Sequence, residues 1–535
     1  AEKLAALDIK HVFGIVSIHN MPIFDAINRL GETQIIDVRH EQAGTHAADG
    51  YARASGNLGV MIASTGPGTT NTVTGLYEAQ TASSRVLVIT GQAETEFYGK
   101  GLAYVHEAEN QVAMLQTVAR RVESPRHIDQ LEGAFNTVVQ DMYTGRGAPG
   151  ALEVPIDLQY ADAQPPSSFE IAAREFAPTP KDIDAALAKI LDSSRRLIIA
   201  GGGVIAADAG EQLTALAERL DAPVITTVDG RGVIPEDHEL CVGNYYQSAG
   251  IYQAVADADL TIAIGTKFAV GVNGQGAMFP PPGELLHIDI DPNMVGRTHR
   301  ADIGIVSDAK TALAALNSGL QDVSPNDGQF NETVWEARDG VHRAMRKRLG
   351  PDYAAMMDCM RDKLPRDGLW LRDSTIAAYN FGNQLFPIYA PRTSINPSSG
   401  AIGPGLPLAI GAAIATNKQT LLMHGDGGFM FHATELATAA QYDVPLVVCV
   451  FNDAGYGVLR WLQDVRFGRI NETDLGKMDF VAMGQSMGVP GQRVENMEEF
   501  DAALSVGMDA QGPYLIDIDM EHFAPMEISI MPKKK

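Results

Sequence analysis

Two acidic residues at a fixed spacing give the clearest indication of chemistry in this sequence. Asp426 lies in a Gly-Asp-Gly-Gly run, and Asp453 follows it by 27 residues. The apolar runs at residues 420–424 and 445–451 precede these aspartates and predict buried strands, and residues 434–442 predict the helix between them. A strand, helix, strand unit has parallel strands and a right-handed crossover. Both aspartates should therefore lie at the carboxyl ends of strands, where open α/β sheets bind ligands.

The types of these residues indicate which ligand would bind there. Carboxylate oxygens are hard donors that suit Mg²⁺, and the glycines beside Asp426 allow a diphosphate to approach the backbone closely. The alternative is a tight turn after one strand and an unrelated acidic turn after the other, which would account for a lone Gly-Asp-Gly. The second aspartate at this spacing favours the metal and the diphosphate.

At this point the chain resembles the thiamine diphosphate (ThDP) enzymes, in particular the acetolactate synthase and benzaldehyde lyase branch, from residue 11 to about residue 519. The resemblance implies that Asp426, Asp453 and the carbonyl of Gly455 hold Mg²⁺, although the family more often has asparagine at the second position. It also implies further contacts to the cofactor, which are Gly427, Gly428, Tyr456 and Gly457.

Glu41 follows a predicted strand at residues 34–38 and begins a predicted helix at residues 41–53. An isolated glutamate there could simply interact with the helix dipole. In the ThDP family, however, the corresponding glutamate hydrogen-bonds the aminopyrimidine ring of the cofactor and exchanges a proton with it. The surrounding motif matches the family closely; it reads Glu-Gln-x-x-x-His-x-Ala-Asp-Gly-Tyr-Ala-Arg. We therefore predict that Glu41 is catalytic.

Residues 399–407 resemble the family segment that shapes the cofactor. There a bulky apolar residue wedges between the two rings, a role that Ile402 fits, and the Gly400 carbonyl would accept from the aminopyrimidine amine. Ser374 and Thr375 end another predicted strand and could donate hydroxyls to the diphosphate. The alternative for residues 399–407, a glycine-rich loop that enters a packed helix, can hold at the same time.

Several polar residues would stand on the substrate side if the resemblance holds. His19 aligns with the active-site histidine of benzaldehyde lyase, and His106 falls where that enzyme has glutamine. Gln92 matches a glutamine of acetolactate synthases. Ser64 replaces a catalytic histidine of benzoylformate decarboxylases, so that proton relay is absent. Histidine can move protons near neutral pH, and we predict catalytic roles for His19, His106 and Gln92.

Lys267 stands where acetolactate synthases carry a substrate-side arginine, and a lysine keeps the charge but loses the bidentate fork. The acidic residues that follow in the family are replaced by Ala-Val-Gly at 269–271. Gly201, Gly203 and Ala206 match only a loose Gly-x-Gly-x-x-Ala, for which a tight turn is the simpler explanation. We therefore do not expect FAD.

Strands alternate with helices through the chain, which predicts an α/β protein with doubly wound parallel sheets. Polar, proline-bearing linkers at residues 165–181 and 322–330 divide the chain. We predict an N-terminal pyrimidine-binding domain at 1–163, a Rossmann-like middle domain at 182–321, and a C-terminal diphosphate-binding domain at 345–531. The first and last thirds repeat one pattern, as in a duplicated fold.

Composition limits the possible partners. A net charge of −25 argues against nucleic acid and anionic membranes. The 3 cysteines are isolated, which suits a reducing compartment such as the cytoplasm, and no apolar stretch has membrane-spanning length. In the family, the groups that correspond to Glu41 and Asp426 meet across a subunit interface. The resemblance therefore implies a homodimer or homotetramer.

Together these residues predict an enzyme that makes or breaks carbon–carbon bonds with ThDP and Mg²⁺. We favour an acetolactate synthase-like 2-oxo acid decarboxylase or carboligase, with a 2-hydroxy ketone lyase of the benzaldehyde type as the alternative. Substrates would be 2-oxo acids, aldehydes or 2-hydroxy ketones. A non-catalytic nucleotide-binding regulator is a remoter possibility, because Glu41 accompanies both acidic metal positions. A nicotinamide oxidoreductase is remoter still, because the Gly-x-Gly-x-x-Ala match is loose.

Overall fold

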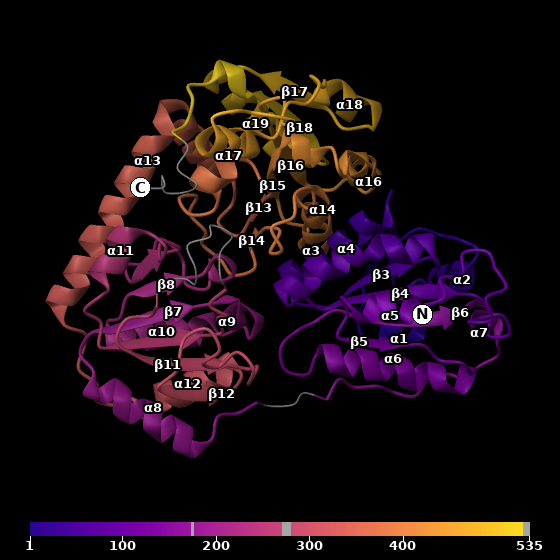
Figure 1. Cartoon of the computed structure of the whole chain (residues 1–535), viewed down its shortest axis with the longest axis horizontal. Helices are drawn as coiled ribbons and strands as arrows, with labels where there is room; N and C mark the ends of the chain where they lie inside the picture. Colours follow the sequence, from indigo (N-terminus) through magenta and orange to yellow (C-terminus); the bar gives the residue numbers. More distant parts are fainter. Residues whose placement is uncertain (173–175, 270–279, 528–535) are drawn as a thin grey trace.

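The computed structural model describes residues 1–172, 176–269 and 280–527. They form three lobes, each built on one six-stranded sheet (Figure 1). Neighbouring strands in all three sheets run parallel. Packed layers cover both faces, so strands such as β3 (Gly59–Ala63) and β16 (Leu446–Asn452) are buried along their whole length. The predicted α/β class with parallel sheets is confirmed.

The N-terminal lobe has the strand order β2-β1-β3-β4-β6-β5. Its other strands are β1 (His11–Gly14), β2 (Gln34–Asp37), β4 (Val86–Gln92), β5 (Arg121–Glu123) and β6 (Gly150–Pro155). Its helices are α1 (Glu2–Ala6), α2 (Met21–Leu30), α3 (Glu41–Ser55), α4 (Pro67–Ala82), α5 (Gln111–Gln116), α6 (Ile128–Met142) and α7 (Ile156–Tyr160). The predicted strand at 34–38 and helix at 41–53 correspond to β2 and α3.

The middle lobe has the order β12-β11-β10-β7-β8-β9, which is the 3-2-1-4-5-6 order of dinucleotide-binding sheets read from the other edge. Its strands are β7 (Arg196–Ala200), β8 (Val224–Thr226), β9 (Cys241–Gly243), β10 (Leu260–Ile264), β11 (Glu284–Asp289) and β12 (Ile303–Val306). Its helices are α8 (Pro180–Asp192), α9 (Gly202–Ala206), the 3₁₀ turn η1 (Val228–Gly230), α10 (Gly210–Leu220), α11 (Ala249–Ala254) and α12 (Ala309–Gly319).

The C-terminal lobe has the order β14-β13-β15-β16-β18-β17. Its other strands are β13 (Leu369–Arg372), β14 (Ser394–Ile395), β15 (Thr420–Gly425), β17 (Gly491–Val494) and β18 (Tyr514–Asp519). Its helices are α14 (Gly405–Thr416), α15 (Asp426–Phe429), α16 (Leu436–Gln441), α17 (Gly457–Phe467), α18 (Phe480–Ser486) and α19 (Met497–Asp509), with shorter turns η2 (Ala378–Gly382), η3 (Ala433–Glu435) and η4 (Met520–His522). The helix predicted at 434–442 is thus split between η3 and α16.

A long helix, α13 (Gly328–Lys363), runs along one side of the molecule from the middle lobe to the C-terminal lobe (Figure 1). It kinks at Gly350, which precedes Pro351 and has φ 73°. Its buried side chains join the two lobes in one apolar cluster. The linker predicted at 322–330 ends early, because the Asp327 carboxylate caps α13 by accepting from Gln329 N at 2.9 Å.

The two terminal lobes have the same topology. Numbered along each lobe, both sheets read 2-1-3-4-6-5, which is what the repeated sequence pattern predicted. Among the helices of the described ranges, none is both long enough and apolar enough to cross a membrane. Two predictions fall outside the described residues. They are the end of the C-terminal domain at residue 531 and residues 270–271 of the Ala-Val-Gly segment.

Candidate active site

The two aspartates predicted to hold a metal lie side by side in the C-terminal lobe. Asp426 follows β15 and Asp453 follows its neighbour β16, which brings both to one sheet edge. Asp426 Oδ2 accepts from Gly455 N at 2.9 Å. Burial, and then the nearby Asp453 carboxylate, raise the pKa of Asp426 to about 7. Burial also raises the pKa of Asp453, and the Arg460 guanidinium, 3.8 Å away, opposes that rise.

Two adjacent, largely buried carboxylates repel one another unless a cation or a proton lies between them. The donors here are hard oxygens, so Mg²⁺ fits the pair better than a soft metal would. Gly455, whose carbonyl is the third predicted ligand, is held tightly, since a Cβ there would lie 2.3 Å from the Thr473 carbonyl oxygen. The residues present therefore fit a magnesium ion.

The neighbouring glycines leave room for a bulky ligand and not for side chains. A Cβ on Gly427 would lie 2.7 Å from the Tyr456 ring, and one on Gly457 would lie 1.7 Å from Asp453 Oδ2. A cavity of 380 Å³ opens beside them. Its lining consists of Asp426, Gly427, Met430, Phe431, Asn452, Tyr456, Leu475, Gly476, Met478 and Phe480.

The residues predicted for the diphosphate and for the cofactor rings come from adjacent loops. Ser374 and Thr375 follow β13, next to β15, and a Cβ on Gly425 would lie 2.9 Å from the Ser374 carbonyl oxygen. Gly400 has φ 78°, a left-handed conformation that favours glycine, and Ile402 follows two residues later. These loops and the two aspartates meet at one edge of the sheet.

Glu41 begins α3 in the N-terminal lobe, where the His40 imidazole caps the helix by accepting from Gln42 N at 3.1 Å. Asn71 Nδ2 on α4 donates to Glu41 Oε2 at 2.9 Å. A Cβ on Gly68 would lie 3.3 Å from Glu41 Oε1. The carboxylate is thus fixed by α4. The sequence did not single out Asn71, because no motif marks it.

His19 and His106 lie together, with ring centroids 5.4 Å apart, and the Tyr104 ring lies 6.1 Å from that of His19. His19 is only 5% exposed. It packs tightly on β4, since a Cβ on Gly91 would lie 2.3 Å from its carbonyl oxygen. Burial, and then His106, lower the pKa of His19 below its usual 6.5. The two predicted histidines therefore lie in contact with one another. Tyr104, which the sequence did not single out, packs beside them.

The sequence was compared with known proteins. Three models of thiamine pyrophosphate enzymes match, for the N-terminal TPP-binding domain at residues 1–116, the central domain at 183–316 and the C-terminal TPP-binding domain at 376–518. A probable acetolactate synthase large subunit of Methanocaldococcus jannaschii is 33% identical over 96% of this chain and 90% of its own length.

The chain belongs to the thiamine pyrophosphate enzymes. Its relatives place it in their acetolactate synthase-like branch. A probable 2-ketoarginine decarboxylase of Pseudomonas aeruginosa is 32% identical over 96% of this chain and 92% of its own length. An acetolactate synthase large subunit of Corynebacterium glutamicum is 30% identical over 96% and 85%. The predicted family is confirmed.

In this thiamine pyrophosphate enzyme, Gln92 lies inside the N-terminal lobe and not on its surface. The side chain is fully buried; Nε2 donates to Glu153 at 3.0 Å and Oε1 accepts from Ala93 N at 2.7 Å. Gln111 Nε2 shares the same carboxylate at 2.8 Å and Gln111 Oε1 accepts from Gly66 N at 2.9 Å. Gln92 and Gln111 therefore support the loops that carry the histidines. Glu153 and Gln111 were not found from sequence.

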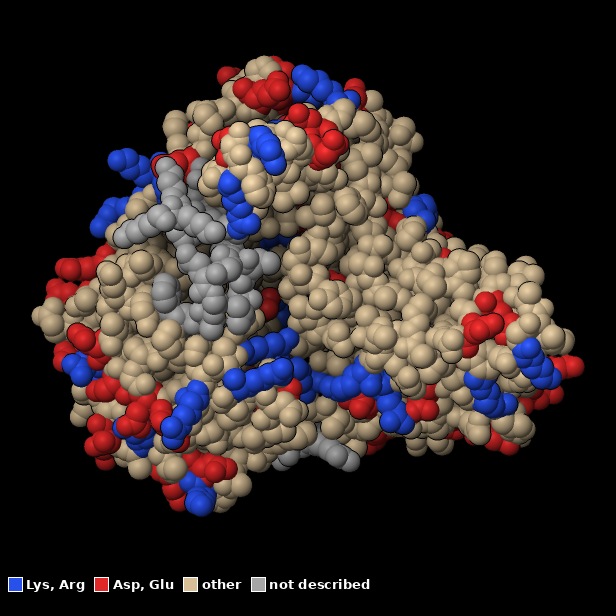
Figure 2. All heavy atoms as spheres, viewed as in Figure 1, with Lys and Arg blue, Asp and Glu red and all other residues tan. Residues whose placement is uncertain are grey.

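Lys267 lies away from the cavity beside Asp426, in a second cleft between the middle and N-terminal lobes. Its ammonium donates to the Thr81 carbonyl at 2.8 Å, and burial lowers its pKa. Figure 2 shows Lys and Arg gathered where these lobes meet. The basic residues that line this cleft are Arg53, Arg85, Arg146, Lys267 and Arg392. Several are already paired, for example Arg146 with Asp289 at 3.0 Å and Arg392 with Asp208 at 2.9 Å.

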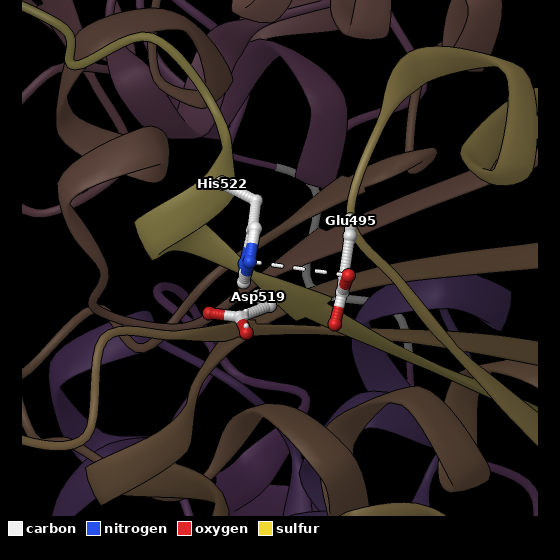
Figure 3. Close-up of side chains that lie close together, drawn as sticks. All are labelled: Glu495, Asp519 and His522. Carbon is white, nitrogen blue, oxygen red and sulfur yellow. Dashed lines mark ion pairs between the residues drawn. The ribbon is translucent and has the colours of Figure 1, made fainter.

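A second group of possible metal ligands lies on the surface of the enzyme at Glu495, Asp519 and His522 (Figure 3). His522 Nδ1 is 3.1 Å from Asp519, and Nε2 is 3.9 Å from Glu495. Arg493 already forms an ion pair with Asp519. This group is an ion-pair network, and the Asp426–Asp453 pair remains the metal site that the geometry favours.

Proposed function

We propose that this chain is a ThDP- and Mg²⁺-dependent 2-oxo acid decarboxylase or carboligase of the acetolactate synthase type. The observation that carries the proposal is the pair of adjacent carboxylates of Asp426 and Asp453 beside the cavity that Asp426 lines, in a chain with all three ThDP-enzyme domains. The names of the relatives support the reaction class, since they include synthases and a 2-oxo acid decarboxylase. A 2-hydroxy ketone lyase is the second candidate, because burial lowers the pKa of His19, which would then be free to accept a proton from a hydroxyl.

Asp426, Asp453 and the Gly455 carbonyl would bind Mg²⁺. Gly427, Gly428, Tyr456 and Gly457, with Ser374 and Thr375, would surround the diphosphate, and Gly400 and Ile402 would contact the rings. When bound, ThDP supplies the carbon nucleophile that adds to the substrate carbonyl. The contribution of the protein is to orient that group and to handle protons.

Proton handling falls to residues of the N-terminal lobe. Glu41, held by Asn71 at 2.9 Å, would exchange a proton with the aminopyrimidine nitrogen. His19 and His106 would transfer protons at the carbonyl or hydroxyl oxygen of the substrate. Gln92 would act indirectly, through the loops that it supports. Because Gln92 is fully buried and Lys267 lies in the second cleft, the preference for 2-oxo acids rests on the relatives and not on these two residues.

The assembly would be a homodimer or homotetramer in the cytoplasm. The cavity beside Asp426 is lined only by C-terminal residues 426–480 within the described part of the chain, and Glu41 is not among them. Apolar side chains are exposed near the histidine pair, at Ile18 (73%) and Val105 (68%), and on the C-terminal lobe at Phe467 (66%). A second copy of the chain would cover such residues and bring a Glu41 to the cavity.

FAD is not part of the proposed enzyme. The glycines at the end of β7 have a packing explanation, because a Cβ on Gly201 would lie 2.2 Å from the Gly265 carbonyl oxygen. Of the basic side chains of that cleft, Arg53, Arg146 and Arg392 form ion pairs, and Lys267 donates to the Thr81 carbonyl. We therefore expect activity without added flavin.

The test combines binding with a substrate panel. Calorimetry should detect ThDP binding only when Mg²⁺ is present, and Asp426→Ala should abolish it. Asp464→Ala, on exposed α17, is the control and should bind as the parent does. With both cofactors and no flavin, 2-oxo acids should release CO₂. ThDP binding to Asp426→Ala at parental affinity would remove the metal assignment, and turnover confined to 2-hydroxy ketones would favour the lyase.

A further inference from the structure

The loop that precedes Gly400 belongs to the C-terminal lobe, yet a buried carboxylate of the N-terminal lobe binds it. Glu78, on α4, is 1% exposed. Its oxygens accept from Ser398 N at 2.5 Å, from Ser399 N at 3.0 Å and from the Ser399 hydroxyl. Three donors on two consecutive residues fix the backbone and not merely a side chain.

Arg53, at the end of α3, completes this contact. Its Nη1 lies 3.6 Å from Glu78 and donates to the Asn396 carbonyl at 2.8 Å, and its Nη2 donates to Ser398 Oγ at 3.2 Å. The guanidinium also lies 3.7 Å from the buried Asp49 carboxylate. Arg53 therefore compensates the buried negative charge and binds the same loop.

The other end of the loop is fixed within the C-terminal lobe. Asp373, at the end of β13, accepts from Gly403 N at 3.0 Å and from Gly405 N at 2.8 Å. Glu78 therefore holds residues 398–399 and Asp373 holds residues 403–405. Only residues 400–402 lie between the two carboxylates, and they include both Gly400 and Ile402.

The N-terminal lobe can act as a rigid support because α3 packs directly against α14 (Figure 1). A Cβ on Gly50 would lie 2.0 Å from the Leu408 carbonyl oxygen, and one on Gly411 would lie 1.8 Å from that of Ala47. Backbones this close leave little freedom for the lobes to slide. The position of Glu78 relative to the loop is thus set by helix packing.

We propose that Glu78 and Arg53 are positioning residues that hold Ile402 in the conformation that receives the cofactor rings, so that ThDP affinity depends on the N-terminal lobe of the same chain. The inference rests on the proposed function, because it takes Ile402 as the ring contact. The diphosphate site at Asp426 does not include this loop, so the two parts of the cofactor should respond differently to a loosened loop.

The test compares two probes on the full-length protein with saturating Mg²⁺, by calorimetry. Glu78→Gln keeps the size of the side chain but places an amide against N–H donors. It should weaken ThDP binding by about tenfold, the loss expected when a charged hydrogen bond is removed. Binding of inorganic pyrophosphate should not change, because that probe has no rings. Ser399→Ala removes the hydroxyl that donates to Glu78 and accepts from Ala401 N at 3.3 Å, but it keeps both backbone bonds to Glu78 and should give a smaller loss.

Glu236→Gln is the matched control. Glu236 is also an interlobe glutamate whose side chain is 8% exposed, and it accepts from Ile388 N at 3.0 Å. It pairs with Arg231, and within the described part of the chain it forms no hydrogen bond to residues 398–402. Even if Glu236→Gln loses as much thermal stability as Glu78→Gln does, it should bind ThDP with the parental affinity. Parental ThDP affinity in both Glu78→Gln and Ser399→Ala would overturn the positioning role. An equal loss for both probes would overturn it too, whereas a parent that binds pyrophosphate but no ThDP would refute the proposed function instead.

Discussion

The histidine pair illustrates how position along the fold sets the chemistry of a side chain. His19 is buried against β4, whereas His106 is exposed on the loop that follows this strand. His106 has φ 65°, a conformation that asparagine tolerates better than most residues. Because burial and the neighbouring His106 both disfavour the charged form of His19, its ring should be neutral at pH 7 and able to accept a proton.

Replacing His106 should therefore raise the pKa of His19. In His106→Asn the backbone can keep its conformation, and the imidazole that lowers the pKa of His19 is removed. NMR titration of the ring should place the parental His19 pKa below 6.5 and the variant value higher. The acid limb of kcat/KM should move to higher pH with it. A parental pKa at or above 6.5, or no movement in the variant, would contradict this account.

The same shift affects stability with a definite sign. The folded-state pKa of His19 is lower than its unfolded value, so the unfolded chain binds the proton first as the pH falls. His19 should thus reduce stability progressively below pH 6.5, and have no such effect above it. His19→Gln should lessen the acid sensitivity of the unfolding midpoint in that window.

The residues that could be predicted from sequence are those fixed by local motifs at strand ends. Asp426 and Asp453 follow apolar strands, and their parallel order brings them together. Asn71, Gln111 and Glu153 could not be found, because each acts through a partner that is distant in sequence. The structure also buries the Gln92 side chain inside the N-terminal lobe, which alignment could not reveal, since burial depends on how the neighbouring loops pack.

At the scale of elements, the contact between α3 and α14 determines how the two terminal lobes meet. Strands and helices were predictable from apolar runs and glycine-bearing turns. The close approach of α3 and α14 could not be predicted, because the glycines at this contact cannot be told from other helical glycines in the sequence. Gly50 and Gly411 owe their place to the carbonyl groups of the opposite helix.

Gly411→Ala should consequently destabilise the protein, by about 1–3 kcal/mol or more, since its Cβ would overlap the Ala47 carbonyl at 1.8 Å. Gly340→Ala, within α13, is the control. A Cβ there meets nothing within 4 Å, so alanine should be neutral or stabilise by up to about 1 kcal/mol through helix propensity. Urea unfolding midpoints should separate the two variants. Equal midpoints would mean that the helices can move apart at little cost.

At the scale of the whole molecule, the two terminal lobes share one topology, and each holds some of the predicted site residues. Glu41 and the histidines belong to one lobe, and the Asp426–Asp453 pair belongs to the other. The division of the chain into α/β domains could be predicted from the sequence, because the pattern of alternating strands and helices repeats. Whether Glu41 and Asp426 of one chain or of two chains would form a site was not readable, because no local sequence pattern records contacts between copies of a chain.

Hybrid assemblies test that combination directly. A Glu41→Gln chain and an Asp426→Ala chain should each be inactive alone, since every site would lack one essential group. If a site joins the N-terminal lobe of one copy to the C-terminal lobe of another, a mixed dimer has one site with both groups intact. Co-expression with two affinity tags and tandem purification should then recover activity, about half that of the parent for a pure mixed dimer. Mixed assemblies without activity, formed by chains that still fold and associate, would show that Glu41 and Asp426 must come from the same chain.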